Sequence, residues 1–160
     1  MSYYLPSGYI DMKRIIEQPY PFQFLIHGRG TGKTYGALKY VLDTHQKFIY
    51  LRRTQTEADL CGSQEFSPFR ALMMDDENLH IVSQKIEHVK NVNGFYLAEL
   101  DEETATYKPT GRAIGYSMAL TTVSNIRGFS MEDCTIVIFD EFIPEKQESK
   151  IGRASCRERV

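Results

Sequence analysis

Short apolar runs alternate with polar, glycine-containing segments along this chain. Residues 22–26, 48–51 and 134–139 are mainly apolar runs rich in aromatic and β-branched side chains. Runs of this length and composition are typical of strands buried on both faces of a parallel sheet. Residues 33–43 instead carry apolar side chains at helical spacing, which predicts a helix with one core-facing stripe. The order of strand, helix and strand predicts an α/β fold with a mostly parallel sheet.

A second group of strands is predicted in the middle of the chain. Residues 81–100 have the pattern of a strand meander, and residues 113–120 form another apolar run. Asn93-Gly94 is a strong signal for a two-residue hairpin turn. We therefore expect a β-hairpin insertion in the sheet.

The loop between the first run and the helix has the composition of a phosphate-binding P-loop. Small residues allow successive backbone N–H groups to turn toward a phosphate, and the helix N-terminus adds a favourable partial charge. The Lys33 ammonium is expected to reach the β- and γ-phosphate oxygens of ATP, and the Thr34 hydroxyl to bind Mg²⁺. His27 stands where the motif has its first glycine, and the alternative interpretation is a turn that binds no ligand. The predicted nucleotide-binding residues are Gly28, Arg29, Gly30, Thr31, Gly32, Lys33 and Thr34.

Two acidic residues, Asp140 and Glu141, follow the apolar run at 134–139 directly. Ligands bind at the carboxyl ends of strands in open α/β sheets, so these acids are expected beside the P-loop. Asp140 is predicted to be the water-mediated Mg²⁺ partner of a Walker B strand. Glu141 is predicted to orient and deprotonate the attacking water, with Lys33 as the other catalytic residue. The alternative is a core strand followed by two solvated acids.

Three further arginines are candidates for contacts with phosphate, DNA or a neighbouring subunit. Arg52 and Arg53 end the run at 48–51, and Arg127 precedes the acidic strand. The alternative for Arg52 and Arg53 is a solvated pair in a loop, and the alternative for Arg127 is a structural anchor. Arg29, inside the loop, is suited to pairing with a phosphate or with an acid of an adjacent protomer.

Composition narrows the class of protein. The chain has 160 residues and a formal net charge of −2. The net charge therefore gives no sign of nucleic-acid binding, and any contact with DNA would be made by a local basic patch. No apolar stretch approaches the roughly 20 residues of a membrane span. Residues 151–160 are rich in arginine and lack periodicity, and they resemble the translation of a sequencing adapter. We therefore expect residues 1–150 to be a partial P-loop ATPase domain and residues 151–160 to be a non-native tail.

Taken together, these motifs resemble the N-terminal part of tailed-phage DNA-packaging ATPases. That family comprises the terminase large-subunit motors and the podovirus-type DNA encapsidation proteins. The resemblance rests on Arg29 within the P-loop and on residues 48–53, 124–128 and 138–143, and it spans roughly residues 22–145. It implies a RecA-like (ASCE) P-loop NTPase core, with ATP and Mg²⁺ as ligands, truncated here after the Walker B strand.

The same resemblance implies a motor that hydrolyses ATP to move double-stranded DNA into a procapsid. Such motors are homo-oligomeric rings at the capsid portal in the host cytoplasm, with no membrane contact. Because the recognisable part ends near residue 145, we expect this chain to bind Mg-ATP but to hydrolyse little of it. Two alternatives remain open: another P-loop ATPase of helicase-loader or secretion type, and a non-catalytic nucleotide-binding module.

Overall fold

The computed structural model describes residues 2–123, 130–131 and 133–141. Arg127 and the expected tail at 151–160 lie outside these residues, as does the chain after Glu141. The strands are β1 Lys47–Arg52, β2 Ile81–Lys85, β3 Val92–Asp101, β4 Thr106–Pro109, β5 Gly115–Ala119 and β6 Cys134–Phe139. The helices are α1 Met12–Ile16, α2 Lys33–Asp43, α3 Gln55–Leu60, α4 Arg70–Asp75 and α5 Leu120–Val123.

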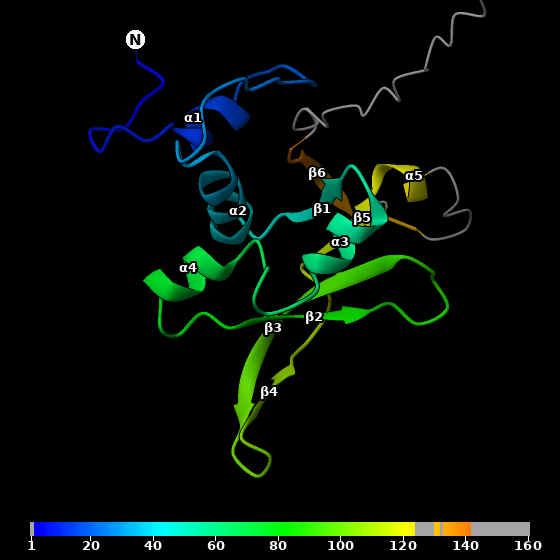
Figure 1. Cartoon of the computed structure of the whole chain (residues 1–160). Coiled ribbons are helices and arrows are strands. Elements are labelled where there is room, and N and C mark those ends of the chain that lie inside the picture. Colours follow the sequence, from blue (N-terminus) through cyan, green and yellow to red (C-terminus); the bar gives the residue numbers. More distant parts are fainter. Residues whose placement is uncertain (1, 124–129, 132, 142–160) are drawn as a thin grey trace, which may run out of the picture.

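The fold is mixed α/β, with one sheet in the order β2-β3-β5-β1-β6 and β4 paired to β3 (Figure 1). β1 is parallel to both β5 and β6, as expected for strands joined by helical crossovers. β3 is antiparallel to β2, β4 and β5. The sheet is therefore mixed rather than mostly parallel, because β2, β3 and β4 follow one another through connections too short for a parallel crossover.

The strand predicted at residues 22–26 is absent from the sheet. These residues form no strand pairing within the described part of the chain, and β6 pairs with β1 alone there. Phe22, Phe24 and Ile26 are 81%, 75% and 78% exposed, whereas Leu25 packs against the cluster of Ile10, Met12 and Ala37. An apolar run is consistent with a buried strand, but it becomes one only where a neighbouring strand supplies hydrogen bonds.

The predicted hairpin exists, but its turn lies elsewhere. Asn93 and Gly94 are inside β3, and the chain reverses between β2 and β3 at residues 86–91. A Cβ on Gly94 would come within 2.8 Å of the Ile86 and Tyr96 side chains. Glycine is therefore needed at this position for close packing rather than for a turn.

The main core lies between the sheet and the helices α2 and α4. Phe48 and Tyr50 of β1 pack with Leu38 and Val41 of α2, and Phe95 of β3 extends the same cluster. Alternate residues of a strand face opposite sides, so Leu51 joins a second cluster on the other face. The face that carries Phe48 and Tyr50 is therefore the face that receives the helix after the loop.

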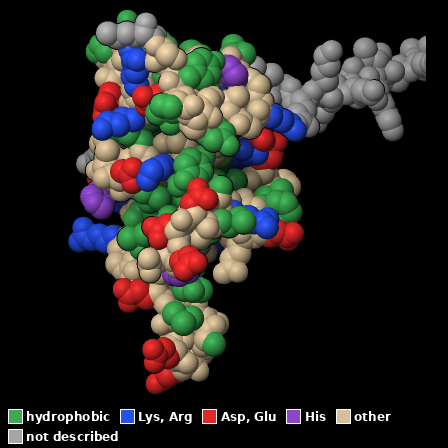
Figure 2. All heavy atoms as spheres, turned by 90° about the vertical axis from the view of Figure 1, so that its left-hand side faces the viewer, with side chains coloured by type: hydrophobic (Ala, Val, Ile, Leu, Met, Phe, Trp, Pro, Cys, Tyr) green, Lys and Arg blue, Asp and Glu red, His purple; other side chains and the backbone are tan. Residues whose placement is uncertain are grey.

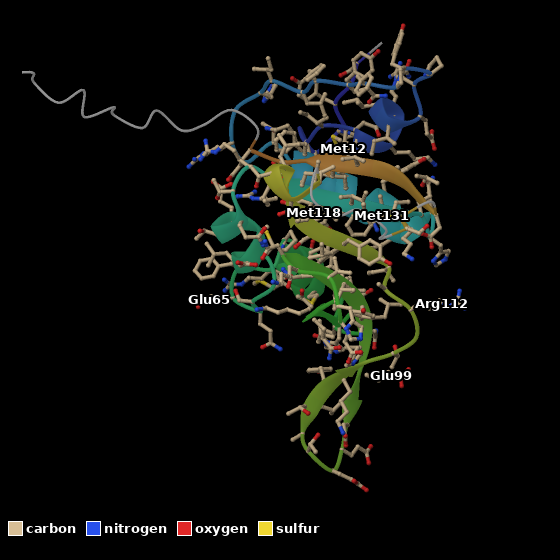
Figure 3. All side chains as sticks on the ribbon, turned by 90° about the vertical axis from the view of Figure 1, so that its right-hand side faces the viewer. Met12, Glu65, Glu99, Arg112, Met118 and Met131 are labelled. Atoms are coloured by element: carbon tan, nitrogen blue, oxygen red, sulfur yellow. The ribbon has the colours of Figure 1, made fainter. Side chains whose placement is uncertain are left out.

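The outer half of β3 and the whole of β4 form a two-stranded ribbon that projects from the body (Figure 1). Figure 3 shows Glu99 on this ribbon and Arg112 where the chain returns to the body. Acidic side chains gather at the end of the ribbon in Figure 2, where the turn carries Glu102 and Glu103. The sequence predicts a hairpin only within residues 81–100, so this ribbon, with its turn between β3 and β4, is a second hairpin that the pattern does not predict.

Helix α3 follows β1 directly and begins with a capping box. The Thr54 side chain accepts from the Glu57 N–H, and the Glu57 carboxylate accepts from the Thr54 N–H. We predict that Thr54→Ala lowers the free energy of unfolding by about 1 kcal/mol, measured by urea denaturation. Thr54→Ser, which keeps the oxygen, is the control, and equal stability of the two variants would contradict this role for the cap.

Candidate functional site

The loop at residues 28–32 has a backbone that requires glycine. Gly30 and Gly32 have φ angles of 73° and 81°, in the left-handed region that other residues rarely adopt. Gly32 is also the N-cap of α2, and a Cβ there would lie 3.1 Å from the Tyr9 ring. The loop therefore leads into α2 so that the N-terminus of the helix faces the loop, as a phosphate site requires.

The Lys33 side chain bends back over this loop. Its Nζ donates to the carbonyl oxygens of Gly28 and His27 at 2.8 and 3.3 Å, and to Thr31 Oγ1 at 3.2 Å. The ammonium group is held by neutral oxygens alone in these contacts. A phosphate oxygen would make a stronger, charge-assisted hydrogen bond with it.

Thr34 and Asp140 are brought into direct contact. The Thr34 hydroxyl donates to Asp140 Oδ2 at 2.7 Å, although the two residues are 106 positions apart in the chain. Asp140 directly follows β6 and Thr34 lies in the first turn of α2, so the acidic strand end meets the loop. Two residues that the sequence predicts to share one Mg²⁺ site therefore lie at hydrogen-bond distance.

β1, the strand beside β6, supplies two more partners of the acidic pair. The Tyr50 hydroxyl donates to Asp140 Oδ2 at 2.9 Å, and Arg52 Nη1 lies 4.0 Å from the same oxygen. Arg52 Nη2 also donates to Glu141 Oε2 at 2.5 Å. Both donors point from one face of β1 because they are two residues apart.

Glu141 has an unusual backbone. Its φ angle is 53°, in the left-handed region, which costs a residue with a Cβ about 1–3 kcal/mol. The Glu141 N–H donates to Asp140 Oδ1 at 3.0 Å, and the ion pair with Arg52 holds its side chain. The Glu141 side chain is 61% exposed, whereas that of Arg52 is only 14% exposed. A largely covered guanidinium thus pairs with a carboxylate that faces solvent.

The other arginines predicted as contacts are placed differently. Arg53 pairs with Glu57 in the first turn of α3, at 3.1 Å, and so belongs to the capping region. Arg29 lies exposed in the loop. Arg52 is therefore an arginine that contacts both members of the acidic pair.

The chemistry of the donor set suits Mg²⁺ held jointly with phosphate. The described residues contain no cluster of three His, Cys, Asp or Glu side chains that would hold a metal by themselves. Mg²⁺ in nucleotide sites takes one or two protein oxygens and completes its shell with phosphate oxygens and water. Thr34 and Asp140 are the two protein groups that would serve such an ion.

A groove of about 460 Å³ adjoins the loop on its N-terminal side. It lies between the N-terminal segment and residues 22–27, and His27 links it to the loop because its Nε2 is 2.9 Å from the Tyr4 hydroxyl. An apolar, aromatic wall of this kind is suited to a flat ring such as the base of a nucleotide. Its aromatic lining includes Tyr3, Tyr4, Tyr20, Phe22 and Phe24.

Tyr50 is the site residue that sequence reasoning missed. Its hydroxyl contacts Asp140 of the acidic pair. In the sequence Tyr50 is one of several aromatic and apolar residues of the run at 48–51, so nothing there sets it apart. The available signal was its spacing of two from Arg52, which places both side chains on one face of the strand.

The fold and the site together define a mixed α/β protein in which a glycine-containing loop faces an acidic strand end. No family model matches the chain, and no curated protein matches it. A solved structure titled "The bacteriophage Phi-29 viral genome packaging motor assembly" contains a chain of similar fold, with a TM-score of 0.60 and 18% sequence identity. The similarity covers 92% of the present chain and 39% of the phi29 chain. At this identity the likeness is one of fold, and the present chain spans well under half the length of its structural neighbour.

Every helix in the described residues is too short or too polar to cross a lipid bilayer.

Proposed function

We propose that this chain is the ATP-binding and hydrolysing part of a motor that moves double-stranded DNA into a viral procapsid. The observation that carries the nucleotide part is the 2.7 Å hydrogen bond between Thr34 and Asp140. It joins the loop to the acidic strand end in the arrangement that a P-loop ATPase uses to hold Mg²⁺. The likeness in fold to a chain of the phi29 packaging assembly supports the DNA-motor part.

Each residue has a role in this proposal. The loop at residues 28–32 and the N-terminus of α2 bind the phosphates through backbone N–H groups. Lys33 exchanges its carbonyl partners for β- and γ-phosphate oxygens. Thr34 and Asp140 hold Mg²⁺, which neutralises charge on the phosphates when bound.

Glu141 is the general base of the proposed reaction. It accepts a proton from water while the water oxygen attacks the γ-phosphorus and the bond from that phosphorus to the leaving ADP oxygen breaks. Arg52 Nη2 donates to Glu141 Oε2 at 2.5 Å, and a carboxylate has a second oxygen, Oε1, that can accept this proton.

The finer fold assignment is part of the same proposal. A RecA-like P-loop core places the loop and the acidic strand at one edge of a sheet, and the contact between Thr34 and Asp140 supports this placement. A homo-oligomeric ring at a capsid portal, in the cytoplasm of the host, is the assembly in which such a core would move DNA. The net charge of −2 requires that the DNA contact be a local surface of this ring.

Asp140→Asn tests the proposal through the metal. Removal of the charge keeps the shape of the side chain but weakens the Mg²⁺ site, by about 100-fold in metal affinity. Fluorescent ATP should bind the parent chain more tightly in Mg²⁺ than in EDTA, and the variant should bind equally weakly in both buffers. Asp133→Asn is the matched control, because Asp133 pairs with Lys47 at the opposite end of β6. Mg²⁺-dependent tightening that survives in Asp140→Asn would contradict the proposal.

The same two variants test the motor part. Short double-stranded DNA should bind the parent chain more tightly with a non-hydrolysable ATP analogue and Mg²⁺ than without nucleotide. Asp140→Asn should lose this difference and Asp133→Asn should keep it. Nucleotide binding without any effect on DNA binding would favour a stand-alone nucleotide-binding module over a DNA motor.

A further inference from the structure

The Tyr50 hydroxyl is an unusual feature of the main core. Tyr50 is 2% exposed and lies with Phe48, Leu38 and Val41, yet its Oη donates to Asp140 Oδ2 at 2.9 Å. A buried phenol needs a partner, and this one uses the carboxylate that ends the neighbouring strand. The ring therefore packs in the core, and the hydroxyl contacts the candidate site.

Asp140 is held by three donors from three different places in the chain. Its Oδ2 accepts from Thr34 Oγ1 and from Tyr50 Oη, and its Oδ1 accepts from the Glu141 N–H at 3.0 Å. A carboxylate oxygen accepts about two hydrogen bonds in good geometry, so Thr34 and Tyr50 together satisfy Oδ2. The plane of the carboxylate is fixed by these contacts.

We propose that Tyr50 is a positioning residue for the metal site, which acts by holding the Asp140 carboxylate in register with the Thr34 hydroxyl. This inference rests on the proposed nucleotide function and names a residue of that site. A ligand group whose orientation is fixed by outer hydrogen bonds binds a metal more tightly than one that must be ordered first.

A further observation supports this role. The Tyr50 ring is buried in the main core, where it lies in one cluster with Leu38 and Val41 of α2. This packing fixes the position from which the hydroxyl donates to Asp140.

Tyr50→Phe is the test, because it removes the hydroxyl and leaves the ring in the core. The measurement is the affinity for fluorescent ATP at a series of free Mg²⁺ concentrations. We expect the half-saturating Mg²⁺ concentration to rise about tenfold. Affinity in EDTA should stay unchanged, because the hydroxyl that is removed donates to Asp140, which in this proposal binds the nucleotide only through Mg²⁺.

Tyr35→Phe is the matched control. Tyr35 also donates to an aspartate, with its hydroxyl 2.7 Å from Asp75 Oδ2, but this contact joins α2 to α4 away from the acidic pair. Loss of this bond should leave the Mg²⁺ dependence at the parent value. Melting curves without ligand show whether each variant is folded.

The outcomes separate the inference from the proposed function. If the parent chain shows Mg²⁺-dependent ATP binding and Tyr50→Phe behaves like Tyr35→Phe, the positioning role is wrong and the nucleotide function stands. If Tyr50→Phe lowers affinity equally in Mg²⁺ and EDTA, Tyr50 supports the core alone and the inference is overturned. If the parent chain binds no nucleotide, the proposed function fails and the inference fails with it.

Discussion

Replacement of Lys33 by alanine is expected to abolish the stabilisation of the chain by Mg-ATP. A ligand present at 100 times its Kd adds about 2.7 kcal/mol to stability, which corresponds to roughly 5–10 °C in Tm for a domain of this size. Lys33 is the cation held at the mouth of the loop by Gly28 and Thr31, where the phosphates would bind. Without its ammonium, the negative charge of the triphosphate has no direct partner on α2. Melting curves with and without Mg-ATP provide the measurement.

Lys39→Ala is the control for this substitution. Lys39 is on the same helix but pairs with Asp43 on its solvent face, so its loss should leave the ligand-induced shift intact. A Lys33→Ala protein that melts later with Mg-ATP by as much as the parent would show that the loop does not bind the nucleotide.

Phe48→Ala is expected to cost about 3–5 kcal/mol in the free energy of unfolding. Phe48 is fully buried, and its ring centroid lies 6.0 Å from that of Phe69 and 6.1 Å from that of Phe95. Its ring also fills the space beside Gly115 on the neighbouring strand, where a Cβ would lie 2.5 Å from the ring. Removal of the ring leaves a cavity that joins β1, β3 and α4. A loss of this size is a large part of the 5–15 kcal/mol that stabilises a typical domain.

Urea denaturation measures this effect, with Phe66→Ala as the matched control. Phe66 is 57% exposed, so its truncation should change stability by less than about 0.5 kcal/mol. Equal costs for the two substitutions would mean that the three-ring cluster is not the centre of the core. Phe48→Leu provides an intermediate case and keeps the comparison measurable if the alanine variant does not fold.

The elements nearest the site were predictable because their patterns are local. The helix expected at 33–43 and the strand expected at 134–139 are α2 and β6 with the same bounds. Glycines in the loop and acids at the strand end were recognisable because they match the pattern of a P-loop followed by an acidic strand. The run at 48–51 is β1, extended by one residue at each end.

Features that depend on neighbours were not predictable in the same way. The run at 22–26 has the composition of a strand, but no described strand lies beside it to supply hydrogen bonds. Asn93-Gly94 matches a turn signal, but the Ile86 and Tyr96 side chains select glycine there for space. The composition of a segment shows which secondary structures it is compatible with, and the neighbouring segments determine which of them forms.

The ion pairs of the arginines near the site also depend on neighbouring elements and could not be predicted from the sequence. Arg52 and Arg53 are adjacent, so the sequence does not show that they have different partners. In the structure Arg52 pairs with Glu141 and Arg53 pairs with Glu57. Arg52 is the last residue of β1 and shares the face of Tyr50, whereas Arg53 already belongs to the segment that leads into α3. The register of Leu51 opposite Phe139 brings the end of β1 beside Asp140 and Glu141.

A calorimetric titration of the parent chain with ATP, in Mg²⁺ and in EDTA, tests the central claim most directly. The proposal that Lys33, Thr34 and Asp140 form one nucleotide site predicts a single site per chain, with a Kd between about 1 μM and 1 mM in Mg²⁺ and weaker binding in EDTA. No saturable heat in either buffer, from a chain whose melting curve shows that it is folded, would contradict it.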